Sequence, residues 1–243
     1  MGEKCVRRSA AVIRVNVVAE GQSEMHCAKG PLNQYLGGRP ILDSRCVLTS
    51  RARWTNYEYR GGLLSYQKAK RDIVSWLKED TQAYVTTMFD FFRLPNDFPG
   101  YEDAMQLSDH LDAVLILESA MKANIISELP GLDVDRRFIP YIQLHEFEAL
   151  LFTNILVLKD DYIDTDDVDS IDRLYAETKD IPPEEINHGT DTAPSKRLLH
   201  AVGYQKGEAV SPLIEAITVE AIRKKCPHFS AWLRQLQSLE DSD

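Results

Sequence analysis

The sequence predicts an α/β protein with a mainly parallel central sheet flanked by helices. Apolar, strand-like runs alternate with helical patterns along the first two thirds of the chain, a rhythm typical of parallel strands. Three of these runs finish in acid, at Glu20, at Asp90 and within residues 145–148. Buried carboxylates are costly unless they are paired or bind a cation. Neighbouring parallel strands that end in this way would gather a metal site at one edge of the sheet.

Composition indicates a soluble globular chain. Its 243 residues, 44% of them hydrophobic, suffice for one sizeable core. The net charge of −10 argues against a protein that binds nucleic acid by charge alone, although cation-binding carboxylates in a nuclease would also count as negative. No apolar run reaches the roughly 18 residues of a membrane helix, and Arg14 and Asn16 interrupt the N-terminal apolar stretch. We therefore expect no membrane segment, no export signal and a cytoplasmic location. The cysteines show neither zinc nor disulfide spacing: Cys5, Cys27, Cys46 and Cys226.

The first half of the chain carries the predicted sheet. Residues 10–19 are rich in Val and Ile and form the expected first strand, after which Gly21 permits a tight turn into a helix. A second strand is predicted over residues 46–51. Residues 65–77 place apolar side chains at helical spacing. The β-branched and aromatic run at residues 83–89 predicts the third strand.

The next segment continues the alternation. Two prolines, Asn, Asp and Gly make residues 94–100 a loop. A helix is predicted over residues 108–126, with Ser108 as its N-cap. Residues 138–144 are the predicted fourth strand, and residues 146–158 are predicted to be helical.

The C-terminal third differs in character. Residues 160–172 contain seven aspartates but lack the Gly and Glu of a calcium loop, so a solvated acidic turn is favoured. Residues 211–239 return to helical spacing, which Pro227 splits. We therefore expect an α/β core over residues 1–158 and a loop and helical elaboration over residues 159–243, packed on the core as one structural domain.

Acids of the first and third strands are the first candidate ligands. Glu20 and Glu24 lie four residues apart on a turn that enters a helix, so both could reach one cation. The alternative is that Glu20 caps the helix and Glu24 is solvated. Asp90 follows a buried run, and carboxylates at strand ends point into the crevice where α/β proteins bind ligands. Asp97, in the proline loop, could be a ligand or cap a turn.

The HEFE segment supplies the third cluster. Glu146 could sit in the first turn of a helix, where the dipole favours a negative charge, while Glu148 points elsewhere. One of the two could be a metal ligand. His145 could carry a proton, bind a metal or serve only as a hydrogen-bonding residue.

A compact basic motif lies in the C-terminal third. Lys196 and Arg197 follow Ser195, and Lys206 comes shortly after them. These side chains could bind a phosphate next to a metal, or they could form a solvated basic patch. The sequence contains no Walker loop, nucleophile elbow or dinucleotide fingerprint.

These acids carry a resemblance to known proteins. EGQSE after the first strand, an Asp after a later strand and acids after a further one resemble the Toprim arrangement of topoisomerase-primase domains and OLD-family nucleases. The segments VVAEGQSE, GGLLSYQKAKRDI, TTMFDFFRLPNDFPG, IPYIQLHEFEALLF and APSKR are similar to a bacterial Toprim-like family of unknown function, DUF4276, across nearly the whole chain. The resemblance implies a Toprim-like, Rossmann-like fold.

The resemblance also assigns roles to particular residues. Glu20 matches the Toprim glutamate, Glu24 the second acid of the EGxxE turn, and Asp90 the first acid of the usual DxD pair. Phe92 replaces the second acid of that pair. Asp97 or a carboxylate of the HEFE segment must then replace that acid as a metal ligand, or the site is weakened or inactive.

The implied chemistry is phosphodiester hydrolysis of DNA or RNA assisted by Mg²⁺ or Mn²⁺, which oxygen-rich ligands favour over zinc. The ions would be bound by Glu20, Asp90 and one acid of the HEFE segment. His145 or Glu24 would accept the proton, and Lys196 or Arg197 would stabilise the developing phosphate charge.

Families of this kind often occur beside an ABC- or SMC-type ATPase and are thought to act in defence against phage. The resemblance therefore implies a bacterial anti-phage effector nuclease with nucleic acid and an ATPase subunit as partners. The alternative is a weakly active or inactive Toprim-fold subunit that regulates or binds such an ATPase, because Phe92 removes an acid and the net charge is negative. The oligomeric state stays open, a homo-oligomer included.

Overall fold

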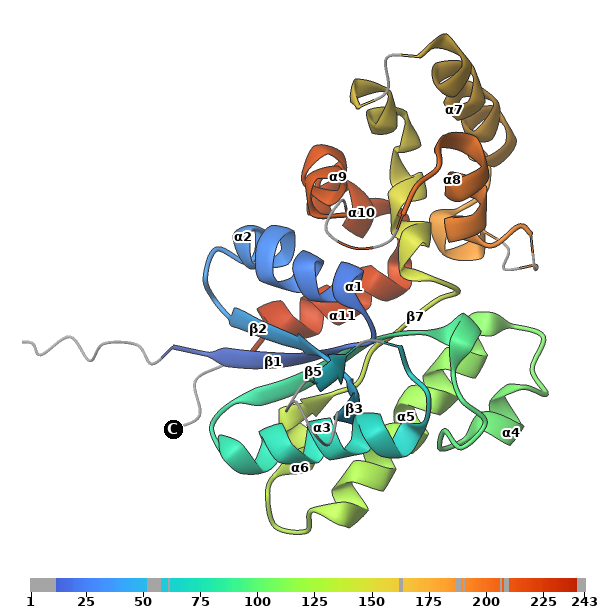
Figure 1. Ribbon diagram of the computed structural model, residues 1–243. Helices are drawn as coiled ribbons and strands as arrows, with labels where there is room; N and C mark the ends of the chain where they lie inside the picture. The colour runs from blue at the N-terminus through green and yellow to red at the C-terminus, as the bar shows by residue number, and fades with distance from the viewer. Residues whose placement is uncertain are drawn as a thin grey trace, which may run out of the picture.

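The structure, a computed structural model, describes residues 12–51, 58–60, 62–161, 164–186, 189, 191–205, 207 and 210–239 (Figure 1). Within these ranges, five parallel strands form the central sheet in the order β2-β1-β5-β6, with β7 also paired to β5. Its strands are β1 (Arg14–Ala19), β2 (Ile41–Cys46), β5 (Tyr84–Asp90), β6 (Phe138–Ile139) and β7 (Ile142–Gln143). The predicted α/β, Rossmann-like class is confirmed.

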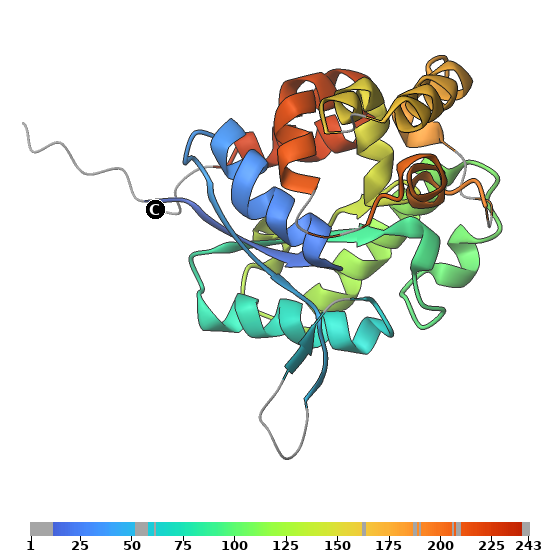
Figure 2. The same cartoon turned by 45° about the horizontal axis from the view of Figure 1, so that its top comes forward.

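The second strand differs from its prediction. The strand beside β1 covers residues 41–46, one segment earlier than expected. This strand alternates exposed and buried positions and carries Asp43 and Arg45, which is typical of an edge strand. Because its sequence is not a continuous apolar run, hydropathy does not predict it as a strand. The residues predicted as the second strand instead supply β3 (Leu48–Arg51), which pairs antiparallel with β4 (Glu58–Arg60) and projects away from the sheet (Figure 2).

The predicted strand over residues 138–144 is interrupted at Pro140. Because proline has no N–H for the ladder, the strand divides into β6 and β7. Threonine hydroxyls of β5 bridge the gap: Thr86 Oγ1 donates to the carbonyl oxygen of Ile139 at 2.5 Å, and Thr87 Oγ1 donates to that of Tyr141 at 2.8 Å. The sheet thus keeps its last strand in place across the break.

Helices cover both faces of the sheet (Figures 1 and 2). The lower layer of Figure 1 packs on β1 and β5 through Val18, Val85 and Phe89. It contains α3 (Tyr66–Glu79), α4 (Tyr101–Ala104), α5 (His110–Glu128) and α6 (Val134–Arg137). The predicted helices at residues 65–77 and 108–126 are therefore present, but Asp109, and not Ser108, caps α5 by accepting hydrogen bonds from two backbone N–H groups.

The opposite face is covered by both ends of the chain. Its N-terminal elements are α1 (Gln22–Cys27), η1 (Ala28–Leu32) and α2 (Asn33–Tyr35). The C-terminal elements on this side are α9 (Val210–Ile217), α10 (Val219–Lys225) and α11 (Pro227–Gln237). The preceding elements, α7 (Thr165–Thr178), η5 (Pro183–Glu185) and α8 (Pro194–Val202), pack on the segment after β7, and α7 and α8 lie at the upper right of Figure 1, away from the strands. One hydrophobic cluster joins Val15 and Val17 of β1 to Phe229 and Trp232 of α11, so the C-terminal helices share the core of the sheet.

The chain after β7 differs in detail from two predictions. Residues 146–158 are helical, as predicted, but they form two 3₁₀ helices, η3 (Phe147–Thr153) and η4 (Ile155–Asp160). Asn154 lies between them with φ near −158°, outside the helical region. The aspartate-rich segment is also more regular than the expected turn, because α7 begins at Thr165 within it and its first turn contains Asp166 and Asp167. Negative charges in a first turn interact favourably with the helix dipole.

The lower layer is joined to the sheet by a buried arginine. Arg137 is 1% exposed, and its guanidinium donates hydrogen bonds to four carbonyl oxygens, those of Leu77, Asp80, Ala83 and Leu132. These carbonyl groups lie at the end of α3, at the start of β5 and just before α6.

None of the helices in the described residues is both long and apolar enough to cross a membrane.

Candidate functional site

Carboxylates connect the carboxyl ends of β1 and β5. Glu20 directly follows β1, and its Oε2 accepts a hydrogen bond from the backbone N–H of Asp90, the last residue of β5, at 3.0 Å. In turn, Asp90 Oδ1 accepts from the backbone N–H of Phe147 at 2.8 Å. Both acids are almost fully buried. The side chains at the two strand ends are therefore held in place by main-chain donors of the next segment along the sheet edge.

Glu24 joins this pair from the first turn of α1. Its Oε2 accepts from the backbone N–H of Gly21 at 2.9 Å, which folds the carboxylate back towards the end of β1. A Cβ on Gly21 would lie 3.1 Å from the same oxygen, so glycine suits this close approach. Glu24 is 5% exposed, and after burial its negative charge is the second cause that raises the pKa of Cys27.

The three carboxylates line one cavity of about 280 Å³. Glycine backbone and small polar side chains form much of the rest of its wall, so the chain leaves room there. The lining residues are Glu20, Gly21, Gln22, Ser23, Glu24, Gly62, Asp90 and Gly207. Gly207, from the loop after α8, donates its N–H to Ser23 Oγ at 3.1 Å, which attaches the C-terminal segment to the cavity. Three carboxylates therefore line a cavity at the carboxyl ends of two neighbouring strands, and we call it the acid cavity.

Glu148 and Glu24 both lie near the side chain of Tyr204. Burial raises the pKa of Tyr204, and the negative charges of Glu148 and then Glu24 raise it further. Both carboxylates must therefore be near this one phenol. Glu148 is fully buried, whereas Tyr204 is 6% exposed. Of the two HEFE acids, Glu148 is the one that shares the Tyr204 phenol with Glu24, the acid of α1.

Glu146 has a different partner. Its Oε2 accepts from the backbone N–H of Ser195 at 3.0 Å, so it holds the first turn of α8 against the segment that follows β7. This contact brings the basic motif towards the sheet edge. Arg197, however, turns to the carbonyl oxygen of Thr192, 2.7 Å from its Nε, and to Glu177, 3.8 Å from its Nη1.

The remaining basic candidates are Lys196 and Lys206. Lys196 lies in the first turn of α8 and is half-buried. Lys206 lies outside the described residues. Asp97 serves as a helix cap, because its Oδ1 accepts from the backbone N–H of Tyr66, the first residue of α3, at 2.8 Å. It is not among the residues that line the acid cavity.

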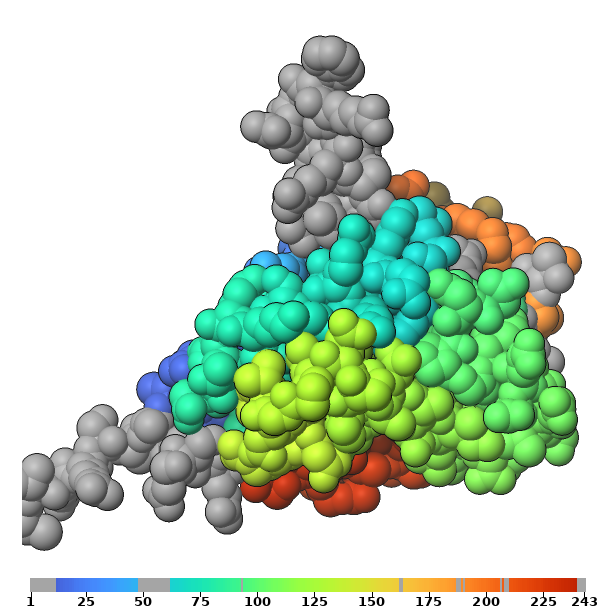
Figure 3. All heavy atoms as spheres, turned by 90° about the horizontal axis from the view of Figure 1, so that it is seen from below, coloured from blue at the N-terminus to red at the C-terminus, as the bar shows by residue number. Residues whose placement is uncertain are grey.

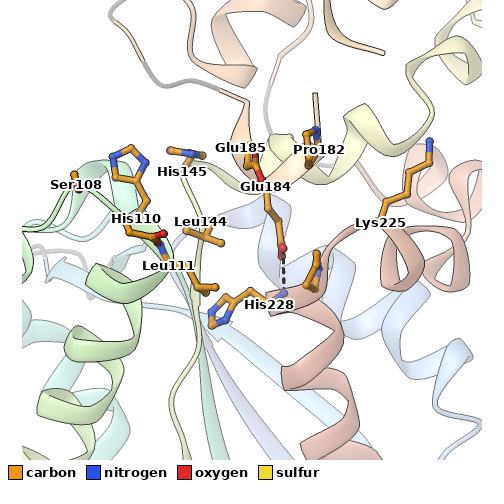
Figure 4. A pocket seen from close by; sticks show the side chains of 12 residues that line it. Ser108, His110, Leu111, Leu144, His145, Pro182, Glu184, Glu185, Lys225 and His228 are labelled. Carbon is orange, nitrogen blue, oxygen red and sulfur yellow. Dashed lines mark hydrogen bonds between the residues drawn. The ribbon is translucent and has the colours of Figure 1, made fainter. Parts of the chain in front are cut away.

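His145 faces a second, larger cavity of about 770 Å³ (Figure 4). Its backbone is left-handed, with φ at 63°, and its carbonyl oxygen accepts from the N–H of Phe92 at 3.0 Å. Its ring meets that of His110, at the start of α5, edge to face with 4.9 Å between centroids. The imidazole therefore lies against the start of α5 and lines the second cavity.

The opposite wall of the second cavity is held by ionisable side chains. Glu184 accepts hydrogen bonds from the backbone N–H groups of His228 and Phe229 at 3.0 and 2.9 Å, which caps α11. Figure 4 shows the bond to His228. Burial raises the pKa of Glu184 despite these bonds. His228 Nε2 lies 3.0 Å from Glu118 Oε1 and 3.1 Å from the carbonyl oxygen of Ile142, so it carries the proton towards both acceptors.

Whether the acid cavity suits a metal ion depends on the oxygen atoms that its side chains offer as ligands. Carboxylate oxygens are the ligands that Mg²⁺ and Mn²⁺ prefer. In the part of the chain that the structure describes, no group of three or more His, Cys, Asp or Glu side chains is arranged to bind a metal. Mg²⁺ commonly takes only one or two carboxylates and completes its shell with water and substrate phosphate. Glu20 and Asp90, linked through one hydrogen bond, fit that smaller requirement.

Several residues in or near the two cavities carry no strong signal in the sequence. Gly207, which lines the acid cavity, belongs to the GYQKG segment, and that segment lacks the spacing of a phosphate loop. Tyr204 of the same segment lies near Glu148 and Glu24. His110 and His228 each stand alone in the sequence, after Asp109 and after Pro227. A histidine at the start of a predicted helix is a weak signal, and only the fold brings these side chains to one cavity.

Comparisons with known proteins identify one family. A family model described as "Domain of unknown function (DUF4276)" matches residues 19–237. The match begins at the last residue of β1 and runs to the end of α11, so it includes the acid cavity, both HEFE acids and the C-terminal helices. A search of curated proteins and a search of solved structures found no match.

Proposed function

This chain belongs to the family Domain of unknown function (DUF4276), and we propose that it is a metal-dependent nuclease that hydrolyses phosphodiester bonds of DNA or RNA. One observation carries the proposal: Glu20, Glu24 and Asp90 line a single cavity at the carboxyl ends of two adjacent parallel strands. Ligands of α/β proteins bind at this edge of the sheet.

Mg²⁺ or Mn²⁺ is the proposed cofactor. Glu20 and Asp90 would bind it from neighbouring strands, with Glu24 or Glu148 as a further oxygen donor. Their main-chain hydrogen bonds fix the side chains before a ligand arrives, as outer contacts do in metal sites. The ion would supply Lewis-acid polarisation of the phosphate and a lowered pKa for an attacking water.

Other side chains would handle the proton and the phosphate charge. Glu24 lines the acid cavity and is our preferred proton acceptor over His145, whose ring faces the second cavity. Lys196 follows Ser195, whose N–H is bound by Glu146, and is therefore the basic side chain best supported to contact a phosphate oxygen. Arg197 already contacts Glu177 and Thr192, which weakens its candidacy.

The wider role follows from the resemblance of VVAEGQSE and the later acids to Toprim domains and OLD-family nucleases. We extend the proposal to an effector subunit of a bacterial anti-phage system that works with an ABC- or SMC-type ATPase in the cytoplasm. A second candidate is a regulatory or interaction subunit with little or no nuclease activity. Phe92 in place of a second acid favours it, as does the small donor set among the described residues.

Cleavage assays with matched variants test the proposal. Plasmid DNA and tRNA would be incubated with Mg²⁺ or Mn²⁺ and with wild type, Glu20→Gln, Asp90→Asn or Asp97→Asn. Each substitution removes a charge but keeps an oxygen that can accept the observed backbone hydrogen bond. Cleavage activity should fall by about a hundredfold in Glu20→Gln and in Asp90→Asn. It should persist in Asp97→Asn, because Asp97 caps a helix outside the cavity.

Two outcomes would defeat the nuclease proposal. Equal activity in all four proteins would assign the cleavage to a contaminant or another site. No cleavage with either metal, even with a candidate ABC- or SMC-type ATPase added, would favour the regulatory subunit.

A further inference from the structure

The second cavity lies where the two layers of helices meet at the carboxyl end of β7. Residues 144–145 follow β7, residues 108–111 lead into α5, and the other wall comes from η5 and the start of α11. The contact of His228 with Glu118 joins α11 to α5, which lie next to each other in the view from below (Figure 3, α11 in red and the end of α5 in yellow-green). The cavity volume of about 770 Å³ is within the range of about 300–1,000 Å³ that is typical of small-molecule sites.

The backbone donors that would attract an anion to this cavity are already bound. Both α5 and α11 begin at its wall, and the N–H groups at a helix N-terminus are a common anion site. Asp109 Oδ1 accepts from the N–H groups of Leu111 and Asp112 at 2.8 and 3.1 Å. Glu184 holds the equivalent position at the start of α11. An anionic ligand would therefore meet a carboxylate of the protein at both helix ends.

Two basic side chains of the lining are engaged as well. Lys225 Nζ donates to the carbonyl oxygen of Thr153 at 2.9 Å. The Nε2–H of His228 is directed towards Glu118 and the carbonyl oxygen of Ile142. These contacts direct the positive charge of both side chains to other partners within the protein, so the cavity is poorly suited to a phosphate or a carboxylate.

Carboxylate oxygens of the lining, in contrast, retain the capacity to accept hydrogen bonds. Within the part of the chain that the structure describes, the Glu185 side chain makes no hydrogen bond or ion pair, and both bonds to Asp109 use Oδ1 and leave Oδ2. Each oxygen of Glu184 receives one N–H and can accept a second. Because burial raises the pKa of Glu184, its two bonds compensate its negative charge only in part.

These acceptors lie at two depths beside apolar side chains. Glu184 is 6% exposed and reaches down to the start of α11, whereas Glu185 is exposed above it (Figure 4). Leu111 and Leu144 lie on the facing wall (Figure 4). The cavity thus combines a buried acid, an apolar wall and acids at its mouth.

We propose that the second cavity binds a small organic cation that carries amino or guanidino groups at both ends of a short apolar chain. One end donates N–H groups to Glu184, where the charge of the ligand compensates that of the buried carboxylate. The apolar chain packs against Leu111 and Leu144. The other end meets Glu185 and Asp109 at the mouth. Hydrogen bonds from a cationic N–H to a carboxylate are charge-assisted and among the stronger ones in proteins.

Other ligand classes fit this lining less well. Among the described residues, no group of three or more His, Cys, Asp or Glu side chains is arranged to bind a metal, although His110 and His145 lie together here. A neutral apolar molecule would displace water from Glu184 without supplying a donor, which is unfavourable for a buried acceptor. The inference does not depend on the proposed nuclease activity, because the second cavity shares no lining residue with the acid cavity.

Calorimetric titration of the full chain tests the ligand class. The probes are agmatine, which has a guanidino and an amino end, and diaminobutane, with butylamine and succinate as controls. Physiological ionic strength is needed, because salt screens unspecific attraction of cations to a chain of net charge −10. Agmatine and diaminobutane should bind, butylamine should bind about tenfold more weakly because it lacks the second cationic end, and succinate should not bind. Equal binding of butylamine, or binding of succinate alone, would overturn the proposal.

Matched variants locate the site. Glu185→Gln and Glu102→Gln, the latter on α4, each remove one exposed carboxylate, so any unspecific attraction falls equally in both. Glu185→Gln should weaken agmatine binding about fivefold, and Glu102→Gln should leave it within about twofold of wild type. Glu184→Gln should weaken it more than about tenfold. Because Glu184 also caps α11, the exposed Glu185 provides the decisive variant if Glu184→Gln unfolds.

A variant of the acid cavity separates this inference from the proposed function. Glu20→Gln should keep the wild-type affinity for agmatine whether or not the chain cleaves nucleic acid. No binding of agmatine or diaminobutane to wild type would overturn the proposal. Equal weakening by Glu185→Gln and Glu102→Gln would do the same, as would loss of binding in Glu20→Gln alone.

Discussion

Removing the carboxylate of Asp90 should have very different effects on stability depending on whether the hydrogen bond to Phe147 is kept. Asp90 Oδ1 accepts from the buried N–H of Phe147 at 2.8 Å. A hydrogen bond to a charged group contributes about 1.5–3 kcal/mol, and a buried donor without a partner costs a similar amount. Asp90→Ala should therefore lower the free energy of unfolding by about 3 kcal/mol.

Asp90→Asn should cost much less. The amide oxygen can accept the same N–H, so a neutral bond worth about 1 kcal/mol replaces the charge-assisted one. Loss of one negative charge next to Glu20 also relieves repulsion, which offsets part of the remaining cost. Urea unfolding followed by tryptophan fluorescence would measure both variants. We expect Asp90→Asn within about 1 kcal/mol of wild type and Asp90→Ala clearly below it.

Asp97 provides the control because it makes an equally short bond, 2.8 Å, to the N–H of Tyr66 but lies outside the cavity lining. Asp97→Ala and Asp97→Asn should differ in the same direction. Mg²⁺ at ten times its Kd should stabilise wild type and Asp97→Asn by about 1.4 kcal/mol and leave Asp90→Asn unchanged. Equal destabilisation by Ala and Asn at residue 90 would refute the assigned role of the hydrogen bond.

Three further predictions concern the core. Burial lowers the pKa of His228, but the hydrogen bond to Glu118 and the charge of Glu118 raise it above 6.5 overall. The protonated His228 therefore stabilises the fold fully below pH 6.5, and this stabilisation is lost as pH rises through the folded pKa. His228→Phe, which keeps a ring over Tyr141, should thus cost about 1–3 kcal/mol by urea unfolding near pH 5.5 and less near pH 8; an equal cost at both would contradict this. Arg137→Met leaves four buried carbonyls without their donor and should lower the free energy of unfolding by about 3–5 kcal/mol, and Arg137→Lys should recover only part of it. Burial, then the charge of Glu184, raises the pKa of Cys226 to about 12, so mass spectrometry should find Cys226 alkylated in urea but not in the native protein at neutral pH.

Hydropathy and turn residues were sufficient to predict most of the sheet. The runs that became β1 and β5 are buried on both faces, and such strands are read from apolar residues alone. An edge strand is half solvated, and β2 therefore carries Asp43 and Arg45 and was assigned one segment too late. The apolar spacing after β7 predicts helical structure but not its type, because it does not distinguish bonds between residues three apart from bonds between residues four apart.

The acids of the site were easier to find than their orientations. Glu20, Glu24 and Asp90 follow strands or enter the next helix, so topology alone places them at one edge. The different directions of Glu146 and Glu148 depend on contacts with Ser195 and with Tyr204, from segments about fifty residues later. Residues so distant in sequence become neighbours only through the folding of the C-terminal helices onto the sheet.

The interruption of the last strand at Pro140 has a consequence for the evolution of the family. Thr86 Oγ1 both donates across the gap to Ile139 and accepts from Trp232 Nε1 of α11 at 2.9 Å. One hydroxyl therefore couples three segments that are widely separated in the gene. We expect the residues at positions 86, 140 and 232 to be exchanged together among homologues, so that a relative without the proline also departs at the threonine or the tryptophan.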